Sequence, residues 1–212
     1  MGAGELFTKR AGWGGWIGLA GLLMSIAGCF GPKAMPTPVW NPDVAADNCM
    51  KQYDTDSDGS LNKKELAASP GLNAAVSYLD ADGDKKLSRE EIRARIQLYQ
   101  ETKVNKQQLC RVTIGETPVM DAEVEFVPED FLKEFIVPAR GSVPPGSQDG
   151  IVIMSSEGLP DAVQVGLYKV KITSPSMKIP PQYNEETTLG YEVSPVTIQG
   201  RDGVPEFKIK RK

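Results

Sequence analysis

Acidic and other oxygen-bearing residues recur at alternate positions in two stretches of the chain. Residues 54–65 read DTDSDGSLNKKE, and residues 80–91 read DADGDKKLSREE. Each stretch has carboxylates at its first, third and fifth positions and closes with a glutamate at the twelfth. Ca²⁺ takes six to eight oxygen ligands in a flexible shell, so this spacing suits a calcium-binding loop. We therefore expect two calcium ions, one bound by each stretch.

Six positions of each stretch are expected to supply the ligands. Side-chain oxygens come from positions one, three, five and nine, a main-chain carbonyl from position seven, and a two-oxygen carboxylate from position twelve. The first loop offers Asp54, Asp56, Asp58, Ser60, Asn62 and Glu65. The second loop offers Asp80, Asp82, Asp84, Lys86, Ser88 and Glu91.

The two loops differ at their sixth position, where the chain must turn with a positive φ. Gly59 stands there in the first loop, but Lys85 stands there in the second. A left-handed conformation costs a residue with a Cβ roughly 1–2 kcal/mol. Since about 1.4 kcal/mol is a factor of ten in affinity, we expect the second loop to bind about ten-fold more weakly.

Helical patterns flank both loops. Tyr53 and Leu79 directly precede the two loops, and an apolar residue directly follows each closing glutamate. Together with further apolar residues one turn away, this spacing puts apolar side chains on one face of each flanking helix. Over about residues 43 to 100 the chain therefore resembles a pair of EF-hands, and we place a helical module at residues 43–105.

Local signals mark where these helices begin and end. Asn41-Pro42 suits the N-terminus of the first helix, and Ser69-Pro70-Gly71 separates the exit helix of the first hand from the entry helix of the second. The last helix is expected from about Arg89 to Thr102. The resemblance also implies that Leu61 and Leu87, at the eighth position of each loop, pair in a short antiparallel ladder.

The composition argues against several classes of function. The 212 residues include 24 Lys+Arg and 28 Asp+Glu, a net charge of −4, with no basic stripe carrying interleaved aromatics, so no nucleic-acid partner is expected. The sequence has no histidine, which removes imidazole bases and most zinc and iron sites. No G-x-S-x-G elbow or other pairing of a nucleophile with a base is visible. We therefore do not expect an enzyme.

The N-terminal segment has the pattern of an export signal. Lys9 and Arg10 precede an apolar, glycine-rich run from residue 11 to 28. The following residues Ile-Ala-Gly-Cys, ending at Cys29, resemble the lipobox of bacterial prolipoproteins. The resemblance implies a signal peptide at residues 1–28, cleavage before Cys29 and acylation of that cysteine. The alternative is an uncleaved transmembrane anchor, for which the run is near the lower length limit.

A proline-rich segment follows the predicted acylation site. Residues 29–42 include four prolines and read as a semi-rigid tether that lifts a domain clear of the lipid surface. The residue after the lipid-bearing cysteine is Phe30, whereas in some bacteria an aspartate at this position retains a lipoprotein in the inner membrane. We therefore expect an exported, membrane-anchored lipoprotein, at the outer membrane or cell surface rather than the inner membrane.

Beyond residue 106 the apolar pattern changes from helical to alternating. Alternation at residues 110–114, 122–126 and 168–172 predicts half-buried strands. Further strands are expected at Ile151 to Ser155, at Tyr191 to Ile198 and at Phe207 to Lys212, the last as an edge strand protected by lysines. The stretch from Gly141 to Gly150 is expected to be a loop.

Residues 109–212 resemble the small transthyretin-like or carboxypeptidase regulatory-like β-sandwich of bacterial envelope lipoproteins. The motifs behind this resemblance are ETPVMDAEVEFVPE, GLYKVKI and IPPQYNEETTLGYEV. Such modules are usually non-catalytic. The predicted fold class is thus α+β in two domains, a helical EF-hand pair at 43–105 followed by an all-β immunoglobulin- or transthyretin-like sandwich at 106–212.

Two cysteines remain once Cys29 is acylated. Cys49 falls in the entry helix of the first hand, and Cys110 falls just beyond the exit helix of the second. These helices lie side by side in a paired EF-hand, and an exported protein meets conditions in which disulfides form. We therefore expect a Cys49–Cys110 disulfide, with two separate buried thiols as the alternative.

These features predict a calcium-binding, lipid-anchored envelope protein. The β-domain would bind an unidentified protein or an envelope polymer, or stiffen an assembly, and calcium would be structural. The alternatives are a calcium-responsive switch, a dockerin-like interaction module and a calcium-dependent hydrolase. Sensor grooves are rich in methionine, whereas Met50 is the only methionine between residues 43 and 108.

Overall fold

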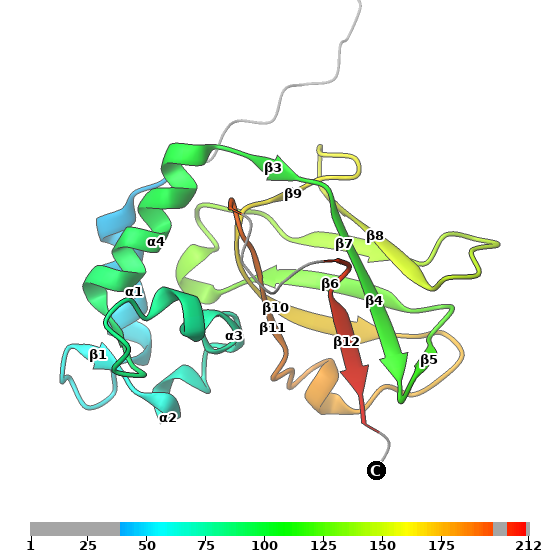
Figure 1. Cartoon of the computed structure of the whole chain (residues 1–212), viewed down its shortest axis with the longest axis horizontal. Helices are drawn as coiled ribbons and strands as arrows, with labels where there is room; N and C mark the ends of the chain where they lie inside the picture. Colours follow the sequence, from blue (N-terminus) through cyan, green and yellow to red (C-terminus); the bar gives the residue numbers. More distant parts are fainter. Residues whose placement is uncertain (1–38, 197–202, 211–212) are drawn as a thin grey trace, which may run out of the picture. The chain divides into compact units, whose positions relative to one another are not determined.

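The helices of the chain precede its main sheet. The structure is a computed structural model that describes residues 39–196 and 203–210 (Figure 1). The predicted signal peptide, Cys29 and most of the tether lie outside these residues. The four α-helices are α1 (Pro42–Tyr53), α2 (Lys63–Leu66), α3 (Pro70–Leu79) and α4 (Arg89–Thr102). No helix within the described ranges is long and apolar enough to cross a membrane.

The helix boundaries follow their capping residues. The Asn41 side chain accepts a hydrogen bond from the Val44 N–H at 3.2 Å, and Pro42 begins α1, as predicted. α4 runs over Arg89–Thr102, which confirms the predicted range. It ends at Lys103, whose left-handed backbone (φ 46°) closes the last turn.

The main sheet has eight strands and is mostly antiparallel. The hydrogen-bonded order is β11-β10-β6-β7-β8-β4-β12, and β5 also pairs with β4; only β12 and β4 run parallel. The strands are β4 (Gln108–Ile114), β5 (Thr117–Pro118), β6 (Glu123–Pro128), β7 (Ala139–Ser142), β8 (Ile151–Ser156), β10 (Gly166–Thr173), β11 (Gly190–Val193) and β12 (Glu206–Ile209).

Four further short strands and two 3₁₀ turns complete the described chain. β1 (Ser60–Leu61) pairs with β2 (Leu87–Ser88), and β3 (Asn105–Lys106) pairs with β9 (Val163–Gln164). The two 3₁₀ turns are η1 (Asp130–Leu132) and η2 (Pro181–Tyr183).

The predicted sandwich of two separate sheets is wrong. Each predicted strand has a counterpart, but β7, which the sequence did not predict, pairs with both β6 and β8 and joins the strands into one sheet. The sheet curls, so that Tyr191 on the edge strand β11 and Phe207 on the edge strand β12 bring their ring centroids to 5.9 Å. Both rings also contact Phe126 on β6.

A glycine explains why the end of β7 was read as the start of a loop, whereas residues 143–150 do form the predicted loop. Gly141 lies in β7 rather than at the start of a loop. A Cβ added at Gly141 would lie 2.3 Å from the carbonyl oxygen of Ile153 on β8, so the close approach of the two strands requires glycine here. Sequence patterns cannot distinguish this use of glycine from a turn.

The helices pack directly on the sheet, so the predicted boundary at residue 105 does not separate two domains. The described helices and strands belong to one compact unit (Figure 1). α3 comes very near β11 at Gly190, where an added Cβ would lie 1.7 Å from the Pro70 carbonyl oxygen. Trp40 stacks on Phe135 with centroids 5.6 Å apart and also contacts Tyr99 of α4.

The predicted Cys49–Cys110 disulfide is not formed, and both cysteines are buried free thiols. The helices α1 and α4 do lie side by side, joined by ion pairs such as that of Arg93 with Asp43 at 2.8 Å. After α4, however, β3 leads the chain to β9, and Cys110 falls within β4, where it faces Val152 of β8. Cys49 instead lies near Glu129. Burial, and to a lesser extent the charge of this carboxylate, raises the pKa of the Cys49 thiol.

Candidate metal centre

The structure gathers the three aspartates of each acidic loop. Asp54, Asp56 and Asp58 place one carboxylate oxygen each within 4.8 Å of one another. Asp80, Asp82 and Asp84 make the equivalent cluster. These clusters lie directly after α1 and α3, whose last residues deliver the first aspartate of each loop.

Hydrogen bonds from the main chain hold the aspartates of the first loop in place. Asp54 Oδ2 accepts from the Gly59 N–H at 3.1 Å, and Asp56 Oδ1 accepts from the Asp58 N–H at 3.2 Å. Asp58 Oδ1 accepts from the Ser60 N–H at 2.9 Å. Each aspartate thus uses one carboxylate oxygen to hold a main-chain N–H of the loop.

The second loop repeats this pattern position by position. Asp80 Oδ2 accepts from the Lys85 N–H at 2.9 Å, and Asp82 Oδ1 accepts from the Asp84 N–H at 3.0 Å. Asp84 Oδ1 accepts from the Lys86 N–H at 2.7 Å. The same three hydrogen bonds, from positions six, five and seven, therefore shape both loops.

The closing glutamates fold back over their loops. Glu65 Oε1 accepts from the Thr55 N–H at 2.7 Å and Oε2 from the Asn62 N–H at 3.0 Å; Glu91 accepts from the Ala81 and Ser88 N–H groups in the same way. Neither glutamate is a member of the aspartate clusters. The hydrogen bonds, the one from Asn62 first, hold the pKa of Glu65 below its ordinary value.

The ninth-position residues have a second role as helix caps. At the start of α2, Asn62 Oδ1 accepts a hydrogen bond from the Lys64 N–H at 2.9 Å. The Nδ2 group of the same side chain donates to Asp56 Oδ2 at 3.3 Å. Ser88 caps α4, accepting from the Glu91 N–H at 3.3 Å. Both form capping boxes with the closing glutamate. The cap therefore fixes the ninth and twelfth positions together.

The two loops pair back to back. Leu61 lies opposite Leu87 and Ser60 opposite Ser88 in the antiparallel β1–β2 ladder, which confirms the predicted pairing. Both leucine side chains are fully buried. Main-chain pairing and a shared apolar contact therefore join the two loops.

The two loops carry similar backbone strain, contrary to the expectation from the sequence. Lys85 does adopt a positive φ, 67°, as predicted, while Gly59 takes 86° at the same position. At the fourth position, however, the order reverses: Ser57 has φ 58° and Gly83 has φ 81°. Each loop thus carries one glycine and one strained residue with a Cβ, so the predicted ten-fold weakening of the second loop loses its basis.

Lys86 adds a contact between the loops that its predicted role did not include. Its side chain crosses to the first loop, where Nζ lies 2.8 Å from Asp58 Oδ2 and 3.5 Å from Ser60 Oγ. The Lys86 hydrogen bond lowers the pKa of Asp58 to about 2. An ammonium group therefore lies at one of the carboxylates expected to bind calcium.

Replacing Lys86 with glutamine should tighten calcium binding at the first loop. The ammonium repels the incoming cation and competes for Asp58, but both groups are solvent-exposed, so we expect only about a two-fold gain at low ionic strength. Lys85→Gln, which removes the same charge one residue away, is the matched control and should leave the first loop unchanged. Equal effects of the two variants in calorimetry would show that only net charge matters.

Asp54 has an oxygen atom that suits a cation. Its Oδ1 is buried and has no hydrogen-bond partner among the described residues. A buried carboxylate oxygen without a donor is unfavourable unless a cation or a water binds it. With the neighbouring Asp56 and Asp58 oxygens within 4.8 Å, the first loop therefore fits a hard cation such as Ca²⁺. Such an ion would supply positive charge that draws these carboxylates together.

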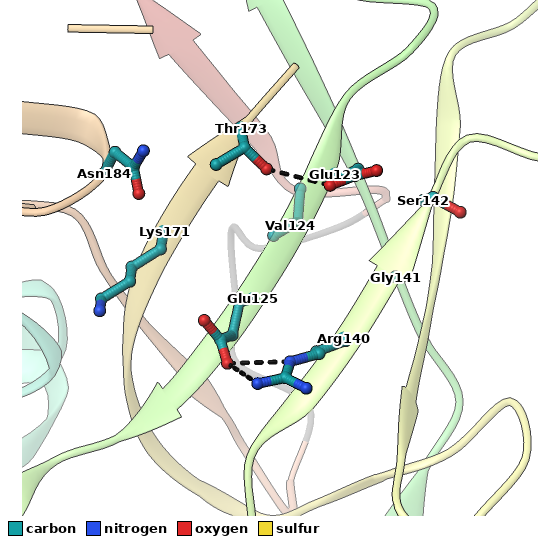
Figure 2. A pocket seen from close by; sticks show the side chains of 9 residues that line it. All are labelled: Glu123, Val124, Glu125, Arg140, Gly141, Ser142, Lys171, Thr173 and Asn184. Atoms are coloured by element: carbon teal, nitrogen blue, oxygen red, sulfur yellow. Dashed lines mark hydrogen bonds and ion pairs between the residues drawn. The ribbon is translucent and has the colours of Figure 1, made fainter. Parts of the chain in front are cut away.

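A second candidate is a pocket of about 400 Å³ on the face of the sheet, over β6, β7 and β10 (Figure 2). Its acidic side chains are already engaged: Glu125 accepts from Arg140 Nη2 at 2.7 Å, and Glu123 accepts from the Thr173 hydroxyl at 3.2 Å. The Ser142 hydroxyl points away from Glu123 (Figure 2). The carboxylates of this lining are thus held by partners from the sheet itself, and the acidic loops are the stronger candidate.

The comparisons with known proteins leave the assignment to the geometry. No protein-family model, no curated protein and no solved structure matches the chain. The repeated hydrogen-bond pattern of the two loops is therefore the main basis for assigning a function.

Sequence reasoning missed two buried carboxylates that join the helices to the sheet. Glu129, between β6 and η1, contacts α1 and α3, and Glu192 on β11 contacts α4. Both side chains are fully buried. Their partners on the helices lie 58 to 97 residues away in the chain, so no local pattern marks them.

Proposed function

We propose that this protein is a calcium-binding protein in which an EF-hand pair stabilises the attachment of the helices to the curled sheet. The repeated loop geometry carries the proposal: both loops cluster three aspartate oxygens, fix them with the same three main-chain hydrogen bonds, and close with a glutamate at position twelve. Random acidic turns would not share this pattern together with a back-to-back β ladder. Two Ca²⁺ ions would be held by the twelve residues predicted from the sequence.

Calcium in this proposal is structural. The opening of a sensor EF-hand requires the two helices of a hand to separate. Here α4 is fastened to the sheet by Arg95, whose Nε and Nη2 donate to Glu192 at 2.6 and 2.8 Å, and α3 is fastened by the Gly71 N–H, which donates to Glu129 at 2.5 Å. Breaking either buried contact would cost more than an exposed one, so these helices resist opening.

A pocket beside the second loop favours a calcium-responsive switch as the second candidate. It measures about 370 Å³ and lies between α3 and α4, with Leu79, Ala94 and Leu98 among its lining residues. If calcium enlarged this pocket, a hydrophobic dye would bind on calcium addition. A dye signal that does not change with calcium supports the structural proposal.

The site of action and the partner of the protein are part of the proposal. The lipobox-like segment ending at Cys29 supports an exported protein anchored by acyl chains, and the proline-rich tether would separate it from the membrane surface. The sheet would bind a protein or an envelope polymer. No enzymatic activity is proposed, because the sequence has no histidine and no G-x-S-x-G elbow.

Calorimetric titration of the purified protein should find two calcium ions bound. Glu65→Gln should remove one binding event and Glu91→Gln the other, because each substitution removes the carboxylate expected to supply two ligand oxygens. Since each loop carries one strained residue, we expect the two affinities to agree within about ten-fold, or about 1.4 kcal/mol. Asp161→Asn, an acidic surface residue of the β8–β9 connection, is the control. The absence of binding at millimolar calcium would end the proposal.

A further inference from the structure

Glu129 is a buried carboxylate that lies between the sheet and two helices. Its side chain is fully buried. Oε1 accepts a hydrogen bond from the Gly71 N–H at 2.5 Å, and Oε2 accepts one from the Tyr53 hydroxyl at 3.3 Å. Lys169 Nζ of β10 lies 3.9 Å from Oε2 and balances its charge. One side chain thus contacts α1 and α3, which are separated in the chain by the first acidic loop.

Both contacts are made at the helices that lead into the acidic loops. Tyr53 is the last residue of α1 and directly precedes Asp54, the first aspartate of the first loop. Gly71 is the second residue of α3, which ends directly before Asp80, the first aspartate of the second loop. Glu129 therefore fixes the entry helices of the two loops relative to each other and to the sheet.

Glu129 also takes the place of a missing helix cap. Ser69 stands at the N-cap of α3, but its side chain makes no capping hydrogen bond. The carboxylate instead receives the Gly71 N–H, and a negative charge at a helix N-terminus is favourable. A Cβ at position 71 would lie 2.9 Å from Glu129 Oε1, so glycine permits this close contact. The start of α3 is thus capped by Glu129, a distant residue, rather than by its own N-cap side chain.

We propose that Glu129 is a positioning residue for calcium binding, through which the two loops and the sheet are coupled. This inference rests on the proposed function. When the entry helices are already held in place, calcium binding loses less conformational entropy, and the affinity for calcium is higher. Because coupling between binding and structure is reciprocal, calcium should in turn tighten the contact between Gly71 and Glu129.

The test compares Glu129→Gln with Glu192→Gln in the full-length protein. Both remove a buried charge that joins the sheet to a helix, but Glu192 contacts Arg95 and Tyr99 within α4, beyond the calcium loops. We expect Glu129→Gln to weaken calcium binding about five-fold or more, and Glu192→Gln to change it less than about two-fold at a similar loss of melting temperature. Unchanged calcium affinity in Glu129→Gln would overturn the inference.

Tyr53→Phe provides a milder variant that should fold in any case. It removes only the hydroxyl that donates to Glu129 and retains the ring, which contacts Phe131 edge-on at 6.2 Å. We expect calcium binding to weaken about two- to three-fold at the first loop only. The binding event of the first loop is the one that Glu65→Gln removes. If Tyr53→Phe weakens neither loop or both equally, direct positioning through this contact is rejected.

Amide hydrogen exchange gives a readout that a purely structural role would not change. Calcium should slow exchange of the Gly71 N–H in the wild type, and Glu129→Gln should abolish that slowing. The N–H of Val170 within β10 is the internal control and should respond to calcium much less. Calcium binding by the wild type without any effect at Gly71 would reject the inference alone, whereas a wild type that binds no calcium would reject the proposed function as well.

Discussion

Chelation of calcium is expected to lower the melting temperature of this protein by roughly 10–20 °C. Each loop gathers three aspartates whose charges repel one another without a cation. A ligand present at 100 times its dissociation constant adds about 2.7 kcal/mol to the free energy of unfolding, so two sites contribute about 5 kcal/mol. For a domain of this size, 1 kcal/mol corresponds to roughly 2–4 °C.

Differential scanning calorimetry with calcium and with chelator measures this shift. The matched control is the double variant Glu65→Gln, Glu91→Gln, in which calcium and chelator should give the same melting temperature. Because no residue of the chain is a histidine, release of a metal by histidine protonation cannot contribute. A wild-type melting temperature that is independent of calcium would contradict a structural role.

Arg95→Met is expected to destabilise the fold by about 3–5 kcal/mol, because it leaves the Glu192 carboxylate buried without its cationic partner. The side chain of Glu192 is fully buried and that of Arg95 only 11% exposed. The Arg95 guanidinium also lies over the rings of Tyr78 and Tyr99, 5.5 and 5.8 Å from their centroids. We expect a fall in melting temperature of roughly 6–20 °C.

Two further variants determine whether the buried pair is responsible. Arg95→Met combined with Glu192→Leu should recover most of the loss, because an apolar pair of similar volume replaces the ion pair without leaving a charge. Arg93→Met, on the same helix, removes a partly exposed arginine paired with Asp43 and should shift the melting temperature by less than about 2 °C. If Arg93→Met destabilised the protein as much as Arg95→Met, burial of the pair would not explain the effect.

The sequence alone determined the acidic loops and most of their surroundings. The alternate aspartates, the sixth-position turn with positive φ and the pairing of Leu61 with Leu87 depend on short-range spacing, and the structure contains each of them. The predicted range of α4 agrees with the structure, in which a capping box at Ser88 marks the start of the helix. The edge position of the last strand followed from its alternating lysines, and β12 is at the end of the sheet.

Only the tertiary structure decided how these parts are joined. Gly141 permits a strand where the sequence suggested a loop, and so converts two expected sheets into one. Cys49 and Cys110 are separated because β3 leads the chain away from α4. Ser57 cancels the expected difference in strain between the loops, because the fourth-position turn depends on main-chain geometry that ligand spacing does not specify.

The buried carboxylates show the same limit of local patterns most clearly. Glu129 and Glu192 look like ordinary acidic residues in the sequence, yet both are fully buried where helices meet the sheet. Their burial is tolerable only because partners from distant segments supply donors, Gly71 and Tyr53 for one and Arg95 and Tyr99 for the other. Local spacing can thus specify a calcium loop, whereas the contacts that orient it depend on how distant segments pack together.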